Sequence, residues 1–222
     1  MATSGSRDFT LDVAEIVEEA YERCGMEVRT GYDSRTARRS LNLMFADWAN
    51  RGVNLWTVKS GTINLVAGTT EYTLTEDVVD ILEVVIRRDG TDFQADRISR
   101  SEYQNIPNKS TTGRPSQVYF NRQTAPKVNV WPAPENSTDV IRYYYVQRIE
   151  DADAAVNNVD APFRFLPCMV AGLAYYMAVK RAPDRVQLLK AIYEEEFQRA
   201  ADEDEDRVAL KLTPSISYMR VT

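Results

Sequence analysis

Histidine is absent from all 222 residues of the chain. Because histidine is the usual general base near neutral pH and the commonest metal ligand, catalytic triads, zinc sites and most acid–base schemes lose their first candidate. Cysteine is scarce as well: Cys24 and Cys168 both lie in apolar stretches, which predicts two reduced core thiols rather than a disulfide or a redox motif. We therefore expect no catalytic residue, no metal site and no cofactor.

The chain also lacks long apolar runs and an excess of basic charge. No stretch approaches the roughly 18 apolar residues that span a bilayer, and residues 1–7 do not resemble a signal peptide. We therefore expect no membrane partner, and synthesis and retention in a cytoplasm. The net charge of -6 argues against a protein that holds nucleic acid through a broad basic surface. Contact with DNA should be weak or passing.

Two amphipathic helices are predicted near the N-terminus. Apolar side chains recur over residues 13–24 at the spacing of one helix face, with Thr10 as the expected N-cap. The second helix is expected to begin at Asp33 or Ser34 and to end at Gly52, since glycine commonly ends a helix.

Short β-rich runs separated by turn residues follow from residue 56 to residue 150, a pattern typical of an antiparallel sheet of about five or six strands. Residues 57–65 and 71–74 flank a turn and are interpreted as a hairpin. Residues 81–87 are nearly continuously apolar, which predicts a central strand buried on both faces. Further strands are expected at residues 117–121, 128–131 and 140–149.

Two more helices are predicted in the C-terminal third. Asp160 is expected to cap a helix with Pro162 near its start, and Pro167 should kink that helix or mark its true beginning. This helix is apolar nearly all round, which is typical of a helix buried between others. A long helix from Arg185 past Arg199 follows after a short loop, so the two should form an antiparallel hairpin.

The predicted fold class is therefore α+β. The N-terminal and C-terminal helix pairs each have one apolar face, and the simplest packing joins them in a helical bundle with an inserted antiparallel β subdomain and an extended C-terminal arm. The predicted boundaries are 1–55 for the N-terminal helices, 56–150 for the β subdomain, 151–210 for the C-terminal helices and 211–222 for the arm.

Charged residues on two predicted helices are candidates for inter-subunit contacts. The basic set is expected to pair with the acidic set, within a subunit or across to a neighbour, and such pairs would set register more than they add stability. The residues are Arg35, Arg38 and Arg39, and Glu194, Glu195 and Glu196. Residues 202–206 are an unbroken acidic run; a solvated helix end is the preferred interpretation, with an interface or a channel wall as the alternative.

The last segment, residues 214–222, contains Ile216, Tyr218, Met219 and Val221 among polar residues. A disordered tail is normally poorer in such side chains. An extended arm that becomes ordered on a partner, by adding a strand to an exposed edge, accounts for them better.

Several short segments occur in a characteristic order. They are LMFADWANRG at 43–52, EYTL at 71–74, VDIL at 79–82, ISRSEY at 98–103, GRP at 113–115, YF at 119–120 and VWPAP at 130–134. In this order they resemble the head-to-tail adaptors of short-tailed bacteriophages (podoviruses), also called tail tubular protein A or tail accessory factors. None of these segments is a catalytic motif, so the similarity lies in scaffold residues.

The resemblance implies a structural protein of the virion that is not an enzyme. Its partners would be further copies of itself in a dodecameric ring, the portal protein above, the tail nozzle below, and double-stranded DNA passing through the lumen without sequence specificity. The arm residues Ile216, Tyr218, Met219 and Val221 would dock on the portal. The alternatives are another tail or head-completion protein, and, from a different class, a carboxylate- and metal-dependent nuclease built from acids in residues 194–206.

Overall fold

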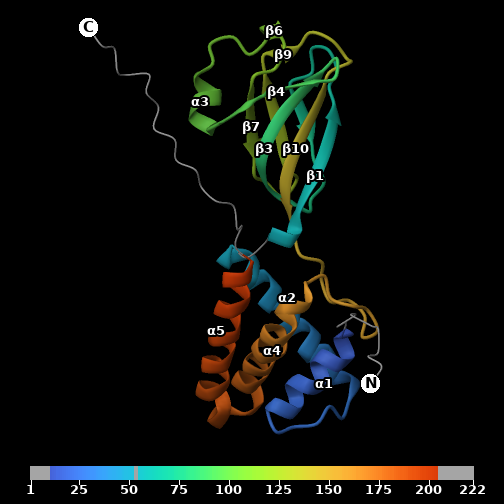
Figure 1. Ribbon diagram of the computed structural model, residues 1–222, viewed down its shortest axis with the longest axis vertical. Coiled ribbons are helices and arrows are strands. Elements are labelled where there is room, and N and C mark those ends of the chain that lie inside the picture. The colour runs from blue at the N-terminus through green and yellow to red at the C-terminus, as the bar shows by residue number, and fades with distance from the viewer. Residues whose placement is uncertain (1–10, 53–54, 205–222) are drawn as a thin grey trace, which may run out of the picture.

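The computed structural model describes residues 11–52 and 55–204, in which helices and strands occupy separate parts of the molecule (Figure 1). Helices α1, α2, α4 and α5 form a bundle at one end, and the strands form an elongated β part at the other. The strand that enters the β part pairs with the strand that leaves it, Val58 lying opposite Val146. These findings confirm the α+β class.

The N-terminal helices α1 (Val13–Arg23) and α2 (Gly31–Arg51) each begin with a capping box. Asp12 caps α1, two residues after the expected Thr10, which lies outside the described residues. Thr30 caps α2, whose start is therefore earlier than expected from Asp33: this carboxylate accepts the Thr30 N–H at 3.1 Å and so lies inside the first turn. Gly52 ends α2 with a φ of 79°, as predicted.

The C-terminal helices are α4 (Leu166–Arg181) and α5 (Val186–Glu203), joined by the short 3-10 turn η3 (Pro183–Arg185). Pro167 stands in the first turn of α4 and marks its true start, as one of the two alternatives predicted. Asp160 is not the cap: the 3-10 turn η2 (Phe163–Phe165) precedes α4, and the Asp160 carbonyl instead accepts the Trp56 indole N–H at 3.1 Å.

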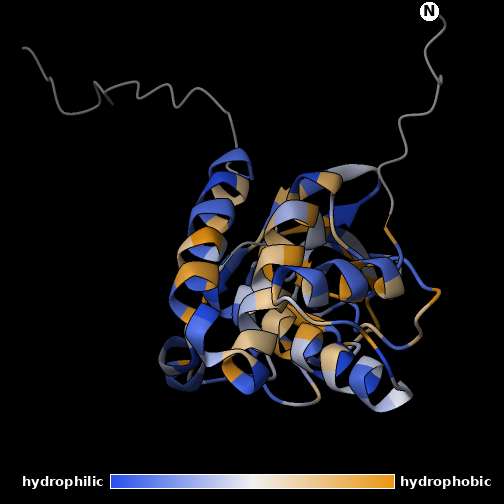
Figure 2. Cartoon of the chain, turned by 90° about the horizontal axis from the view of Figure 1, so that it is seen from below, coloured by the Kyte–Doolittle hydropathy of each residue, from blue (hydrophilic) through white to orange (hydrophobic). Residues whose placement is uncertain are grey.

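Helix α4 is the centre of the bundle and packs against α1, α2 and α5, which explains its apolar character on nearly every side. Gly172 permits the closest approach, because a Cβ there would lie 2.4 Å from Met44 Sδ and 2.7 Å from Tyr193 Cε2. The surrounding helices are amphipathic, and Figure 2 shows hydrophobic and hydrophilic residues alternating along them.

The described strands form two four-stranded sheets and a two-stranded one. The first sheet has the order β1 (Val58–Asn64), β10 (Val140–Gln147), β3 (Val78–Arg88) and β4 (Thr91–Gln94), and the second has β2 (Glu71–Thr73), β8 (Lys127–Trp131), β7 (Gln117–Asn121) and β5 (Asp96–Ile98). The short pair is β6 (Thr112–Gly113) and β9 (Ala133–Pro134), and helix α3 (Arg100–Asn105) follows β5. Most pairs are antiparallel; β5–β7 and β6–β9 are parallel. One buried cluster includes side chains of both large sheets, among them Ile86 and Val130.

Three predictions about the strands are wrong. Residues 57–65 and 71–74 do not form a hairpin, because β1 pairs with β10 while β2 pairs with β8 in the other sheet. Strand β3 is central, as expected, but it is buried on one face only: Leu82 is 46% exposed. The strands also exceed the five or six expected, since several are only two to four residues long and carry no periodic signal.

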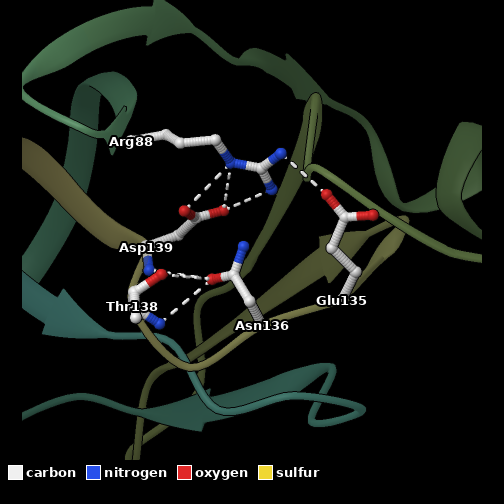
Figure 3. Close-up of polar contacts among 5 residues, drawn as sticks. All are labelled: Arg88, Glu135, Asn136, Thr138 and Asp139. Carbon is white, nitrogen blue, oxygen red and sulfur yellow. Dashed lines mark hydrogen bonds and ion pairs between the residues drawn. The ribbon is translucent and has the colours of Figure 1, made fainter.

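An ion pair between the partly exposed Arg88 and the buried Asp139 holds one corner of the first sheet (Figure 3). The guanidinium of Arg88 donates two hydrogen bonds to Asp139 Oδ2, at 2.6 and 2.9 Å, and a third contact reaches Glu135 at 2.7 Å. Only 1% of the Asp139 side chain is exposed. Asn136 Oδ1 accepts hydrogen bonds from the backbone N–H groups of Thr138 and Asp139, both at 3.0 Å, so the loop before β10 is held in place from both sides.

Candidate interaction surfaces

The basic residues predicted for contacts lie on the first half of α2 and differ in their surroundings. Arg38 donates to the backbone carbonyl of Asp153 and thereby holds the segment that returns from the β part. Among the described residues, Arg35 contacts only its own helix, where it donates to the Gly31 carbonyl at 3.4 Å. Arg39 makes no hydrogen bond or ion pair within the described part of the chain. Arg35 and Arg39 thus carry charge that no acidic side chain among residues 11–52 and 55–204 neutralises.

The acidic residues predicted on α5 are neutralised within the chain, but not by Arg35, Arg38 or Arg39. Glu194 receives two hydrogen bonds from the guanidinium of Arg51, at 2.9 and 3.2 Å. Glu195 and Glu196 both pair with Arg199, which follows them by four and three residues on the same helix. The pairing of the two predicted sets inside one subunit is therefore not seen, and their role between subunits stays a prediction.

Arg51 is a positioning residue that the sequence reasoning missed. Besides Glu194 it binds Asp47 on its own helix at 2.9 Å, and its guanidinium lies 4.5 Å from the centre of the Phe197 ring. The hydrogen bonding of Arg51 to the Glu194 carboxylate is the largest of the effects that raise the pKa of Arg51. The (i, i+4) spacing of Asp47 and Arg51 just before Gly52 could have indicated an ion pair at the end of this helix. This contact joins α2 to α5 at the end of the bundle nearest the β part.

The acidic run is only partly solvated. Asp204 is buried and pairs with Arg164 from the turn before α4, so this position departs from the expected solvated helix end. Asp202 is exposed and accepts a hydrogen bond from Gln198 at 2.7 Å. Residues 205 and 206 lie outside the described residues, as do the arm residues Ile216, Tyr218, Met219 and Val221.

A groove opens between α1 and the start of α4, with a volume of about 630 Å³. Its floor is apolar and includes Leu166, Pro167 and Val170. Its rim is acidic along α1, where four glutamates follow the outer side of the helix: Glu15, Glu18, Glu19 and Glu22. Phe163 stands at the edge of the groove with 66% of its surface exposed. An acidic rim over an apolar floor favours a basic segment with large apolar side chains.

Clusters of metal-binding side chains and reactive thiols are not found in the described ranges. No group of three or more side chains of the metal-binding types converges within residues 11–52 and 55–204. Both cysteines are buried, and burial raises the pKa of the Cys168 thiol to about 12, which disfavours a reactive thiolate. In that same part of the chain, none of the helices combines the length and apolar character needed to cross a bilayer.

Comparison with known proteins agrees with the scaffold resemblance. A search of curated proteins gave no match. A family model described as SU10 adaptor protein matches residues 12–215, which include the bundle helices and the whole β part. Because this match covers nearly the whole chain, the protein belongs to the SU10 adaptor protein family, a family of phage head-to-tail adaptors, and is a structural adaptor protein of a phage virion.

Proposed function

We propose that this adaptor assembles as a ring beneath the portal protein, joins the portal to the tail, and lets double-stranded DNA pass through its lumen. The observation that carries the proposal is the family match over residues 12–215. The separation of a helical bundle from a β part supports it, because an adaptor needs one region for its own ring and another for the next component. The twelve-fold stoichiometry belongs to the proposal and follows from the resemblance alone.

The bundle is the region we assign to ring contacts. Arg35 and Arg39 have no acidic partner among the described residues and lie on the surface of the bundle, and α1 carries a row of glutamates. Arg38, Glu194, Glu195 and Glu196 make contacts within the subunit and, in this proposal, add to the register of neighbouring bundles from their exposed sides. The β part is directed toward the tail. We retain the boundaries 1–55, 56–150, 151–210 and 211–222 as functional units of this arrangement.

Passage of DNA fits the charge of the chain. A duplex that must slide through a ring is retarded by every lysine or arginine that neutralises a phosphate, because each such contact binds it. A net charge of -6 per subunit keeps these contacts few. The lumen in this proposal therefore repels the duplex weakly and binds it at no fixed site.

The assembly experiment compares the full chain with a chain that lacks residues 214–222, each alone and mixed with the portal protein of the same phage, by native mass spectrometry. The full chain should give a ring-sized species, spontaneously or only with portal. The truncated chain should remain folded by circular dichroism and fail to bind portal, because Ile216, Tyr218, Met219 and Val221 are then missing.

Two results would contradict the proposal at different points. A full chain that stays monomeric and ignores portal would remove the ring and the portal contact together. A truncated chain that binds portal as well as the full chain does would remove the arm and leave the ring.

A further inference from the structure

Helix α1 displays acidic charge that no basic side chain in the described part of its own subunit neutralises. Glu18 and Glu22 form no ion pair or hydrogen bond with any side chain in the part of the molecule that the structure describes, and they stand four residues apart, where like charges destabilise a helix. Their neighbours are engaged locally: Glu19 binds Arg23 at 2.9 Å, and Glu15 accepts the Asp12 N–H in the capping box. This like-charged pair beside an apolar groove does not stabilise the subunit, and binding of a basic partner would account for it better.

Helix α2 displays a complementary row on its outer side. Tyr32, Arg35, Arg39 and Leu43 follow one another at intervals of three or four residues and therefore share one face. The two apolar members are unusually exposed, Tyr32 at 63% and Leu43 at 56%. Burial, and to a lesser extent the nearby charges of Arg39 and Arg181, lower the pKa of Lys180, so other basic groups lie close to this row.

The two rows match in charge and in the spacing of their charged pairs, because Glu18 and Glu22 are four residues apart and so are Arg35 and Arg39. At about 1.5 Å per residue, Glu15 to Glu22 extends about 10 Å along its helix and Tyr32 to Leu43 about 16 Å along its own. The arginines lie between the two apolar side chains of their row. A helix laid along the groove can therefore set its arginines against the glutamates while an apolar end reaches the floor formed by Leu166 and Val170.

The two rows are not in contact within the described part of one subunit. Helices α1 and α2 both pack against α4 through their buried faces, and the members of both rows are exposed. No ion pair connects them across the described residues. Two complementary patches at different places on one chain make a head-to-tail contact between copies, and such a contact closes into a ring when its rotation is right.

We propose that the groove between α1 and α4 of one copy receives the α2 row of a second copy, and that this is the repeating contact of the ring. The inference rests on the proposed function and names its contact surfaces. Glu18 and Glu22 face Arg35 and Arg39 of the neighbour, while Tyr32 or Leu43 of the neighbour covers the apolar floor with Phe163. A second copy is preferred over another partner because the missing charge of each row is present on the other.

The test uses two full-length variants with reversed charge, Glu18→Arg/Glu22→Arg and Arg35→Glu/Arg39→Glu, and compares ring formation alone, with portal and in mixture. Each variant alone places like charges on both sides of the contact, which should lower the assembled fraction at least about tenfold. An equimolar mixture places opposite charges at every junction between unlike copies. It should restore assembly to within about twofold of wild type, in rings of alternating variants.

A matched control reverses two other exposed basic side chains, Lys59→Glu/Arg100→Glu, in the β part. It has the same net charge as the α2 variant and should assemble like wild type. Circular dichroism should show all variants folded, since the reversed positions are exposed or at the rim of the groove.

The failure of this contact is distinguishable from the failure of the ring. Variants that assemble like wild type, or a mixture that stays as dissociated as its components, would overturn the contact while a wild-type ring still stands. Loss of portal binding by rings that form normally would assign the groove to the portal and overturn it as well. A wild-type chain that forms no ring with or without portal would overturn both proposals.

Discussion

The buried hydrogen bond between Trp48 and Tyr193 gives the most direct test of the bundle. The indole N–H of Trp48 donates to the Tyr193 hydroxyl at 2.9 Å, and the two residues are 0% and 1% exposed. Tyr193→Phe removes the acceptor and leaves the ring in place, so the indole N–H is buried without a partner. Leaving such a donor unsatisfied costs about 1–3 kcal/mol.

The expected loss lies in the lower part of that range. Removing the hydroxyl also removes a polar group whose burial was itself unfavourable, which offsets part of the cost. We expect about 1–2 kcal/mol in the free energy of unfolding, and a fall of about 2–8 °C in the melting temperature for a chain of this size. The helical signal in circular dichroism should be followed during urea unfolding, because the bundle and the β part have separate hydrophobic clusters.

Tyr175→Phe is the matched control. Its ring stacks on Tyr193 with centroids 6.0 Å apart, but its hydroxyl makes no hydrogen bond within the described residues. This control should change the free energy of unfolding by less than about 0.5 kcal/mol. The double variant Trp48→Phe/Tyr193→Phe should cost less than the sum of its single variants, since both remove one interaction. A Tyr193→Phe variant as stable as the control would refute the reasoning.

Two further predictions concern buried groups. Neither Cys24 nor Cys168 should react with a thiol reagent at pH 8 until denaturant is added, and one fast thiol in the folded chain would contradict their burial. Burial raises the pKa of the Cys168 thiol from 9.0 to about 12, so the unfolded chain loses this proton at a lower pH than the folded chain does. The free energy of unfolding of the wild type should therefore decline as the pH rises above about 9. It should decline less in Cys168→Ala. Asp139→Ala should destabilise the β part by about 1–3 kcal/mol, because Arg88 loses a buried partner but is itself partly solvated. The measurement is the urea midpoint followed by the fluorescence of Trp131, the tryptophan of the β part. Asp92→Ala, which breaks the exposed pair with Arg87, should have a much smaller effect, and equal effects would contradict the importance of burial at the Asp139 corner.

Local patterns accounted for the helices and for some of the strands. The spacing of apolar residues predicted α1, α2, α4 and α5, and the glycine and proline signals located the end of α2 and the start of α4. These features depend on side chains within a few residues of one another, which a sequence displays directly. The caps were placed less well, because Asp12 and Thr30 compete with other polar residues for the same role.

Such local patterns could not predict which strands pair or which charged residues form ion pairs. Strand β1 pairs with β10, where Val58 meets Val146, and not with the strand that follows it in the chain. Glu194 pairs with Arg51 and not with the arginines at the start of α2. In both cases several partners satisfy the local chemistry equally, and only the packing of distant segments selects one of them.

The sequence by itself determined the fold class, the absence of histidine chemistry and, through the order of its scaffold segments, the adaptor family. These follow from composition and from short-range spacing, which persist in any conformation of the chain. The tertiary structure decided which charges are neutralised within the subunit and which remain exposed on α1 and α2. That distinction is a matter of distances between side chains far apart in the chain, and folding alone sets those distances.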